Sequence, residues 1–315
     1  MSVVEQKELN ISSISEGKLT WIYIEKPSAK EVESLARNFN FHPLNLDDVL
    51  SRIQRPKIDE YEDHLFIVLH FPVFDKENRI TRPSEVNIFI GENYIVTIHC
   101  DANLKPLAKF FRECQIHKEI REAYLGRSSA FLLYHILDRL VNYCFPILSK
   151  ITESIDEIED VIFNKTIPET VHKISLIRRD LISFRRVIHP QIAVIETLEQ
   201  EEYPFFKEEQ EIYFGDIADH IRKIWDGLED SKEVVDGLAE TSNWLTSNRI
   251  QEIMRVLTIV MAVIAPATLI TGFVGMNISL PGIKPDSFLP FGILLFIIIL
   301  IGIGMFLYFR HRRWI

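Results

Sequence analysis

The sequence predicts an α/β domain, then a long helix, then two C-terminal helices that cross a membrane. Three observations support this order. Short apolar runs alternate with amphipathic stretches in the first 204 of the 315 residues, which is typical of a domain with helices packed on a sheet. No proline interrupts residues 205–265, so one helix can extend through them. Residues 256–274 and 288–309 are apolar and carry no charge.

The α/β prediction rests on four runs rich in β-branched and aromatic residues, which favour strands. These runs are residues 21–24, 65–71, 86–90 and 94–99. Between the first two runs, residues 28–39 have a helical pattern that opens with a capping box from Ser28 to Glu31. Because helix and strand signals are interleaved in this way, we expect a mixed sheet.

Helical patterns predominate after Ser128. In residues 148–164, isoleucines recur every three or four positions beside acidic residues, which predicts an amphipathic helix. Residues 169–197 predict a second helix, antiparallel to the first. The chain is therefore expected to contain a cytosolic α/β domain with a helical hairpin (1–204), a stalk helix (205–255), a first span (256–274), an external loop (275–287), a second span (288–309) and a basic cytosolic tail (310–315).

The two apolar runs each have about the 20 residues that a helix needs to cross the hydrocarbon core. Arg249 and Arg255 precede the first run and three arginines follow the second, whereas the loop between the runs carries only Lys284 and Asp286. Positive residues favour the cytoplasmic side of a membrane. We therefore expect a multi-pass protein of the cell (inner) membrane, with both termini in the cytoplasm.

The overall composition argues against several classes of function. The formal net charge is −10, whereas chains that bind nucleic acid are more often basic. The three cysteines form no paired motif and the N-terminus lacks a signal-peptide pattern, so we expect reduced thiols in a cytoplasmic domain. The sequence contains no Walker loop, Rossmann glycine pattern or His-Glu-x-x-His motif, and we expect that the protein is not an enzyme.

One face of the first span has the composition of a pore lining. Polar and small residues recur among apolar ones at steps of three or four, which places them on one side of a helix. Together with the apolar residues among them, the positions of this face are Gln251, Met254, Leu257, Met261, Ala265, Thr268 and Gly272. Two spans cannot enclose a pore alone, so a pore requires several copies around an axis. The same face would also suit helix packing within a bilayer, and both interpretations stay open on the pattern alone.

The tripeptide Gly275-Met276-Asn277 stands at the outer end of the first span. In this setting, residues 247–277 resemble the pore helix of the CorA family of Mg2+ channels. Residues 42–50 and 54–70 resemble that family's cytosolic domain, and residues 310–315 resemble its basic C-terminus. The resemblance covers nearly the whole chain, and it implies a funnel-shaped homopentamer.

The resemblance also implies roles for individual residues. The selectivity filter falls on Gly275, Met276 and Asn277, and the pore-lining positions fall on the face of the first span given above. The cytosolic regulatory Mg2+ positions fall on Asp48 and Asp216, with Asp47, Asp138 and His220 nearby. Mg2+ would then be both the transported and the regulatory ion.

The sequence departs from the family pattern at three places. Val274 stands where the family usually has a tyrosine before the motif, and residues 279–282 replace the family's acidic loop pattern. Gln251 stands at the pore position that the family often fills with asparagine. The first two departures keep the related ZntB zinc transporters open as an alternative. However, the first span has no Asp, Glu, His or Cys, which fits a hydrated hard cation better than a dehydrated Zn2+.

The sequence therefore predicts a divalent-cation channel that mediates Mg2+ influx, with Co2+ and Ni2+ as further candidate ions. Cytosolic Mg2+ bound between subunits would control its gate. One alternative is a ZntB-like, proton-coupled Zn2+ transporter. Another is a two-span membrane scaffold that transports nothing. The expected partners are other copies of the chain, the lipid bilayer and divalent cations, and not nucleic acid.

Overall fold

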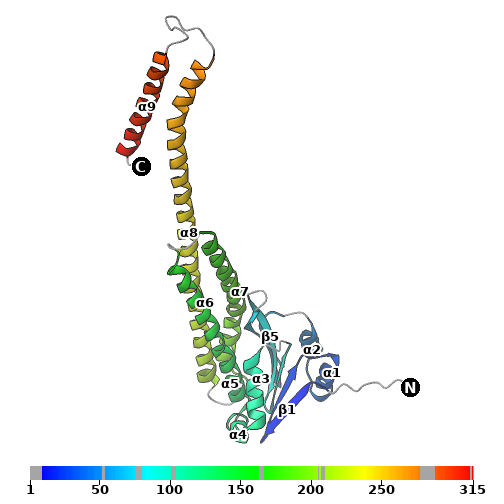
Figure 1. Ribbon diagram of the computed structural model, residues 1–315. Coiled ribbons are helices and arrows are strands. Elements are labelled where there is room, and N and C mark those ends of the chain that lie inside the picture. Colours follow the sequence, from blue (N-terminus) through cyan, green and yellow to red (C-terminus); the bar gives the residue numbers. More distant parts are fainter. Residues whose placement is uncertain are drawn as a thin grey trace, which may run out of the picture. The chain divides into compact units, whose positions relative to one another are not determined.

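The computed structural model describes residues 9–51, 54–75, 80–100, 104–162, 167–204, 206, 210–276, 288–312 and 314. The chain divides into two compact units, Met1–Ala239 and Glu240–Ile315, and its elements are labelled in Figure 1.

The first unit contains a six-stranded sheet. In chain order the strands are β1 (Ile11–Glu16), β2 (Leu19–Glu25), β3 (Lys57–Glu60), β4 (His64–Asp75), β5 (Ile80–Gly91) and β6 (Tyr94–His99). Their order in the sheet is β1-β2-β6-β5-β4-β3. Strands β2 and β6 are parallel and the other neighbours are antiparallel. The predicted mixed sheet and its four predicted strands are confirmed; β1 and β3 were not predicted.

Two short helices cover one face of the sheet. They are α1 (Ala29–Asn38) and α2 (Pro43–Leu50). Val32 of α1 and Val49 of α2 pack in one apolar cluster with Phe66, Phe89 and other sheet residues. Fully burying a side chain of this size contributes roughly 1.5–3 kcal/mol, so this cluster fixes where α2 lies on the sheet.

The start of α1 agrees with the sequence prediction. Ser28 is its N-cap, and its side chain accepts a hydrogen bond from the Lys30 backbone N–H, while Glu31 accepts a hydrogen bond from the Ser28 backbone N–H. This reciprocal capping satisfies N–H groups that the first helical turn leaves without a partner. The predicted capping box is confirmed.

The opposite face of the sheet packs on α3 (Lys105–Ile116), α4 (Lys118–Leu125) and α5 (Ser129–Asn142), with α4 against β1 and β2 and α5 against β6. Trp21 of β2 is fully buried between the rings of Phe110 and Phe111, with ring centroids 5.2 and 5.0 Å away. Its indole N–H donates to Thr97 Oγ1 at 3.0 Å, so the polar group of this large side chain is satisfied inside the core.

Long helices complete the chain. They are α6 (Cys144–Glu159), α7 (Ile167–Gln200), α8 (Gln210–Val274) and α9 (Phe288–His311). Helices α6 and α7 pack together, and α7 packs on β4 and β5; Figure 1 shows the pair running in opposite directions. The ion pairs Arg178–Asp236 and Arg222–Glu196 join α7 to the first part of α8.

Helix α8 continues through residue 255 without a break. The two predicted helices of the hairpin are present, although α6 begins before residue 148 and ends at Glu159.

The first part of α8 approaches α6 closely at Gly227, where an added Cβ would lie 2.8 Å from a terminal carbon of Leu148. A larger residue there would force the two helices apart or move Leu148.

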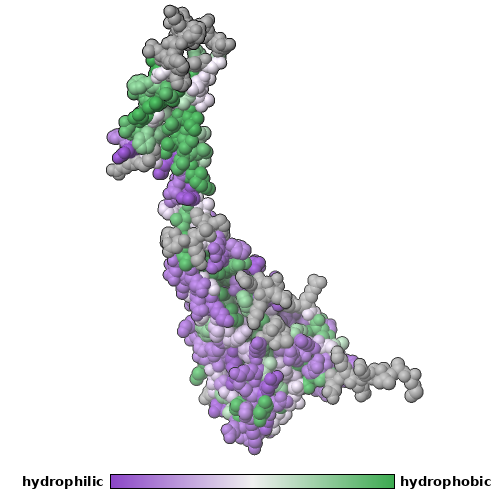
Figure 2. Space-filling model, in the orientation of Figure 1, coloured by the Kyte–Doolittle hydropathy of each residue, from purple (hydrophilic) through white to green (hydrophobic). Residues whose placement is uncertain are grey.

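The second unit exposes its apolar side chains. Two stretches, Glu211–Phe273 and Gly292–His311, lie in helices that are long and apolar enough to cross a membrane by length and composition. Figure 2 shows the hydrophobic residues gathered on the C-terminal helices. The predicted spans, residues 256–274 and 288–309, fall in these two helices, and their crossing of a membrane stays a prediction.

Candidate metal centre and pore helix

Two helices of the first unit bring together three of the predicted metal ligands. Asp138 lies on α5, and Asp216 and His220 lie one turn apart on α8. The ligand atoms of all three residues lie within 4.8 Å of one another. The imidazole lies between the carboxylates, with Nδ1 3.9 Å from Asp138 Oδ1 and Nε2 3.9 Å from Asp216 Oδ1.

The surroundings of these ligands favour a positive charge between them. Burial raises the pKa of Asp138, and the neighbouring Asp216 raises it further, although His220 opposes this rise. His220 Nδ1 is buried and makes no hydrogen bond within the part of the chain that the structure describes. A cation at this position would relieve the repulsion between the carboxylates and give the ring nitrogen a partner.

Two further side chains hold these carboxylates in place. The Tyr134 hydroxyl donates to Asp216 Oδ2 at 3.0 Å, and Asn142 Nδ2 donates to Asp138 Oδ1 at 2.6 Å. Burial raises the pKa of Tyr134 to about 12, with Asp216 adding to the rise, so the hydroxyl remains a donor at neutral pH. Hydrogen bonds of this kind orient the ligands of metal sites.

The donor set fits a divalent cation. Two carboxylates supply the oxygen ligands that Mg2+ prefers, and Mg2+ usually keeps several of its waters. The separations of the ligand atoms leave room for a cation bound directly or through such waters. The imidazole would in addition suit Co2+ or Ni2+.

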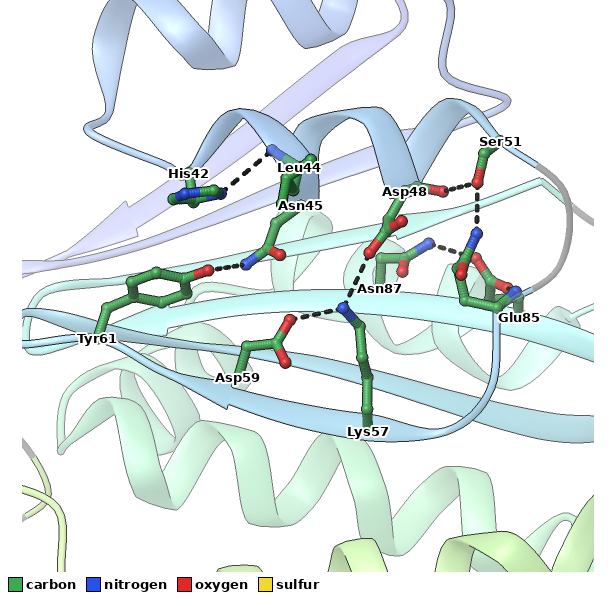
Figure 3. A network of polar contacts seen from close by, with 11 residues as sticks. His42, Leu44, Asn45, Asp48, Ser51, Lys57, Asp59, Tyr61, Glu85 and Asn87 are labelled. Carbon is green, nitrogen blue, oxygen red and sulfur yellow. Dashed lines mark hydrogen bonds and ion pairs between the residues drawn. The ribbon is translucent and has the colours of Figure 1, made fainter.

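The other two predicted ligands lie on α2, outside this group of three. Asp47 is exposed and Asp48 is half-buried. Asp48 Oδ2 accepts a hydrogen bond from Lys57 Nζ at 2.9 Å, and the same ammonium donates to Asp59 Oδ2 at 2.6 Å. Figure 3 shows these contacts between α2 and β3. The predicted meeting of Asp48 with Asp216 involves two subunits, and it stays a prediction.

The predicted pore-lining residues share one side of α8. The seven positions from Gln251 to Gly272 are all exposed in the single chain. Half-buried positions of the same stretch are Ile259, Ala262, Val263, Pro266, Ala267 and Ile270. At 100° per residue the two sets are centred on different sides of the helix. The exposed set is therefore free to face other copies of the chain or a pore.

The helix ends at the predicted filter. Gly275 N donates to Thr271 O at 2.9 Å, and Met276, which follows, is exposed. Asn277 and the remainder of the predicted external loop lie outside the described residues.

Sequence reasoning missed two residues of these sites. Tyr134 lies four positions before Asp138 on α5, so their shared helix face was a usable signal. Lys57 lies nine positions from Asp48 and on another element. No local spacing relates the two residues, and only the fold brings them together.

The chain combines a mixed α/β unit, in which two carboxylates and an imidazole converge, with two helices apolar enough to cross a membrane. This architecture suits a membrane protein that handles cations. The family described as "CorA-like Mg2+ transporter protein" matches residues 16–312. The chain belongs to this family.

Individual relatives agree with this assignment. The chain is 29% identical over 299 residues to "Cobalt/magnesium transport protein CorA" of Thermotoga maritima, covering 94% of this chain and 83% of that protein. It is 28% identical over 316 residues to the protein of the same description from Methanocaldococcus jannaschii, covering 100% and 96%.

A solved structure is also similar over the whole chain. It is described as the complete structure of the CorA magnesium transporter from Methanocaldococcus jannaschii, and it matches with a TM-score of 0.82 and 25% identity, covering 100% of this chain and 96% of that one. The mixed sheet, the long helix and the two C-terminal apolar helices are thus features that this chain shares with a CorA structure.

Proposed function

We propose that the protein is the subunit of a divalent-cation channel that carries Mg2+ into the cytoplasm. The observation that carries this proposal is the exposed face of α8, where Gln251, Thr268 and small residues lie among apolar ones. This face continues through the charge-free part of the helix and leads to Gly275-Met276-Asn277. Membership of a family of Mg2+ transporters, and relatives described as cobalt/magnesium transport proteins, support it.

The chemistry of the path suits an ion that keeps its water. Mg2+ loses its hydration shell reluctantly, so a pore that removed all the waters would oppose a large barrier. A ring of neutral amides at Asn277 would hydrogen-bond to the water shell, whereas a ring of carboxylates would retain the ion too strongly. Gln251 and Thr268 supply further neutral polar groups on the same face.

The channel requires several copies of the chain. One chain offers one candidate pore helix, and cyclic symmetry closes a ring of such helices. The resemblance to CorA favours five copies in a funnel, with residues 1–255 and 310–315 in the cytoplasm and residues 275–287 outside. Size-exclusion chromatography with light scattering in mild detergent tests this: five subunits are expected, and a monomer that still conducts would contradict the proposal.

The regulatory site is proposed to form between subunits. Asp47 and Asp48 of one copy would face Asp138, Asp216 and His220 of its neighbour, and cytosolic Mg2+ would bridge them. The carboxylates repel one another when the ion is absent. High cytosolic Mg2+ would therefore hold the ring closed, and low Mg2+ would loosen it.

Ion flux into proteoliposomes tests the transport function directly. With Mg2+, Co2+, Ni2+ and Zn2+ compared in parallel, Mg2+ uptake is expected without a pH gradient. Zn2+ uptake that depends on a pH gradient would instead favour a ZntB-like transporter. Absence of flux for every ion would favour a two-span scaffold.

A further inference from the structure

The ammonium group of Lys57 lies where two carboxylates converge. Lys57 opens β3, and Asp59 lies two residues along the same strand, so both side chains point to one face of the sheet. Asp48 reaches the same point from α2. The ammonium contacts Asp48 Oδ2 at 2.9 Å and Asp59 Oδ2 at 2.6 Å (Figure 3).

The surroundings fix this ammonium and keep it charged. It lies 5.3 Å from the centroid of the Phe66 ring, which adds a cation–π attraction. Burial alone would lower the pKa of Lys57, but the bonds to Asp59 and Asp48 raise it above its usual value. All three side chains are half-buried, which limits screening by water.

The position of α2 does not depend on Lys57 alone. Asn45 Nδ2 donates to the Tyr61 hydroxyl at 2.9 Å, which ties the first turn of α2 to the chain after β3. The Gln54 backbone N–H donates to Glu85 Oε2 at 2.6 Å. Leu46 and Val49 of α2 are also buried in the core beneath it. Removing the charge of Lys57 should therefore leave α2 in place.

We propose that Lys57 occupies the cation position formed by Asp48 and Asp59, so that a divalent cation that binds Asp48 must displace it. Lys57 thereby sets the Mg2+ concentration at which the site fills. This inference rests on the proposed regulatory role of Asp48, and it adds Asp59 as a ligand available once the ammonium has left.

The two competing cations differ in a way that suits a sensor. A lysine ammonium is a compact charge on a flexible stem, so it can leave the carboxylates without unfolding β3. A divalent cation attracts the two carboxylates more strongly but must give up part of its hydration. Competition between the two shifts half-saturation of the site to a higher Mg2+ concentration than the carboxylates would give without Lys57.

The test measures Mg2+-dependent protease resistance of the full chain in detergent. Lys57→Met should lower the Mg2+ concentration at half-protection about tenfold, as expected for the loss of one nearby unit charge at a half-exposed site. Lys57→Arg keeps the charge and should stay within twofold of the wild type. Lys118→Met is the matched control, since Lys118 pairs with Glu122 at 3.1 Å on the surface of α4, and it should also stay within twofold.

Asp59→Asn supplies a second, independent variant. In this variant Lys57 pairs with Asp48 only, and the carboxylate of Asp59 is no longer available as a ligand. The Mg2+ concentration at half-protection should therefore rise at least threefold. A merely structural role for Lys57 would lower the melting temperature without Mg2+ and leave the half-protection concentration unchanged.

The outcomes separate this inference from the proposed function. If the wild type gains no protection from Mg2+, the regulatory function fails and this inference fails with it. If the wild type responds but Lys57→Met and Asp59→Asn keep its half-protection concentration, only the role of Lys57 is refuted. Should Lys57→Met fail to fold, Asp59→Asn decides alone.

Discussion

In the unit Met1–Ala239, the large apolar side chains of the central strands are withdrawn from solvent, whereas in the unit Glu240–Ile315 comparable side chains are exposed. Leu69 of β4 is 0% exposed and Leu300 of α9 is 60% exposed. The first unit follows the rule for folding in water, where burial of apolar area supplies the main driving force. The second unit needs an apolar solvent or neighbouring copies to cover it, because exposed apolar faces of this extent are rare in soluble monomers.

Charge is distributed between the units in the same contrasting way. The first unit places acidic side chains in pairs and clusters, as at Asp138 and Asp216. In the second unit, residues 256–274 carry no charge at all. In the function proposed above, the first unit would sense cations by holding them at charged ligands, whereas the second would let cations pass by offering neutral groups.

The largest expected effect concerns Asn277, which follows the uncharged part of the proposed pore helix. Asn277→Ala should reduce Mg2+ uptake by proteoliposomes to background, because it removes the amide ring that holds the hydrated ion. Ser279→Ala, two residues further along, is the control and should retain uptake. A well-assembled Asn277→Ala oligomer with wild-type flux would refute the assignment of the filter.

The next effect concerns the charged cluster. Asp216→Lys should remove the Mg2+ dependence of protease resistance, because the lysine would offer a fixed positive charge to the partner carboxylates in place of the metal. Asp219→Lys reverses a charge one turn away on α8, at a residue that is 79% exposed by its side chain, and it should respond to Mg2+ as the wild type does. A wild-type Mg2+ response from Asp216→Lys would place the sensor elsewhere.

The difference in burial between the units predicts unequal costs for one substitution. Leu69→Ala should lower the free energy of unfolding by about 2–5 kcal/mol, since it leaves a cavity in a packed core. Leu300→Ala should cost less than about 1 kcal/mol, since its side chain is exposed within the chain. Chemical denaturation in detergent, followed by circular dichroism, measures both values. Equal costs would show that α9 is packed as tightly as the sheet.

The smallest effect is local and depends on pH. Burial would raise the pKa of Glu31, but hydrogen bonds from Ser28 and from the Asn10 backbone lower it to about 2. Since the folded pKa lies below the ordinary value of 4.5, Glu31 stabilises the fold above about pH 4.5, and this contribution is lost as the pH falls towards 2.

Ser28→Ala tests this contribution. It should cost about 1 kcal/mol at pH 7 and make the loss of stability between pH 4.5 and pH 2 shallower. Ser34→Ala, in the interior of α1, should change neither. An unaltered pH profile in Ser28→Ala would contradict the role of the capping box.

Local signals in the sequence were enough to predict part of this fold. The capping box of Ser28 and Glu31 depends on residues three apart, and the four predicted strands have continuous apolar patterns. Strands β1 and β3 were missed because their side chains are mostly exposed or half-buried. Such strands are defined by the neighbours they pair with, and a pattern search does not see those neighbours.

Local spacing likewise predicts some contacts of the candidate sites and misses others. Asp216 and His220 are four apart on one helix, so spacing alone places them together. Asp138 comes from another helix, and its place beside them was expected only from the resemblance to CorA. The pairing of Asp48 with Lys57 depends on how α2 lies over β3, which no spacing in the sequence encodes.

The initial rate of Mg2+ uptake by proteoliposomes under an imposed membrane potential, with no pH gradient, tests the central claim most directly. Each elementary charge that crosses 100 mV gains about 2.3 kcal/mol, so the rate should rise steeply as the interior is made more negative. Uptake no greater than that of protein-free liposomes, or uptake that requires a pH gradient, would contradict the account.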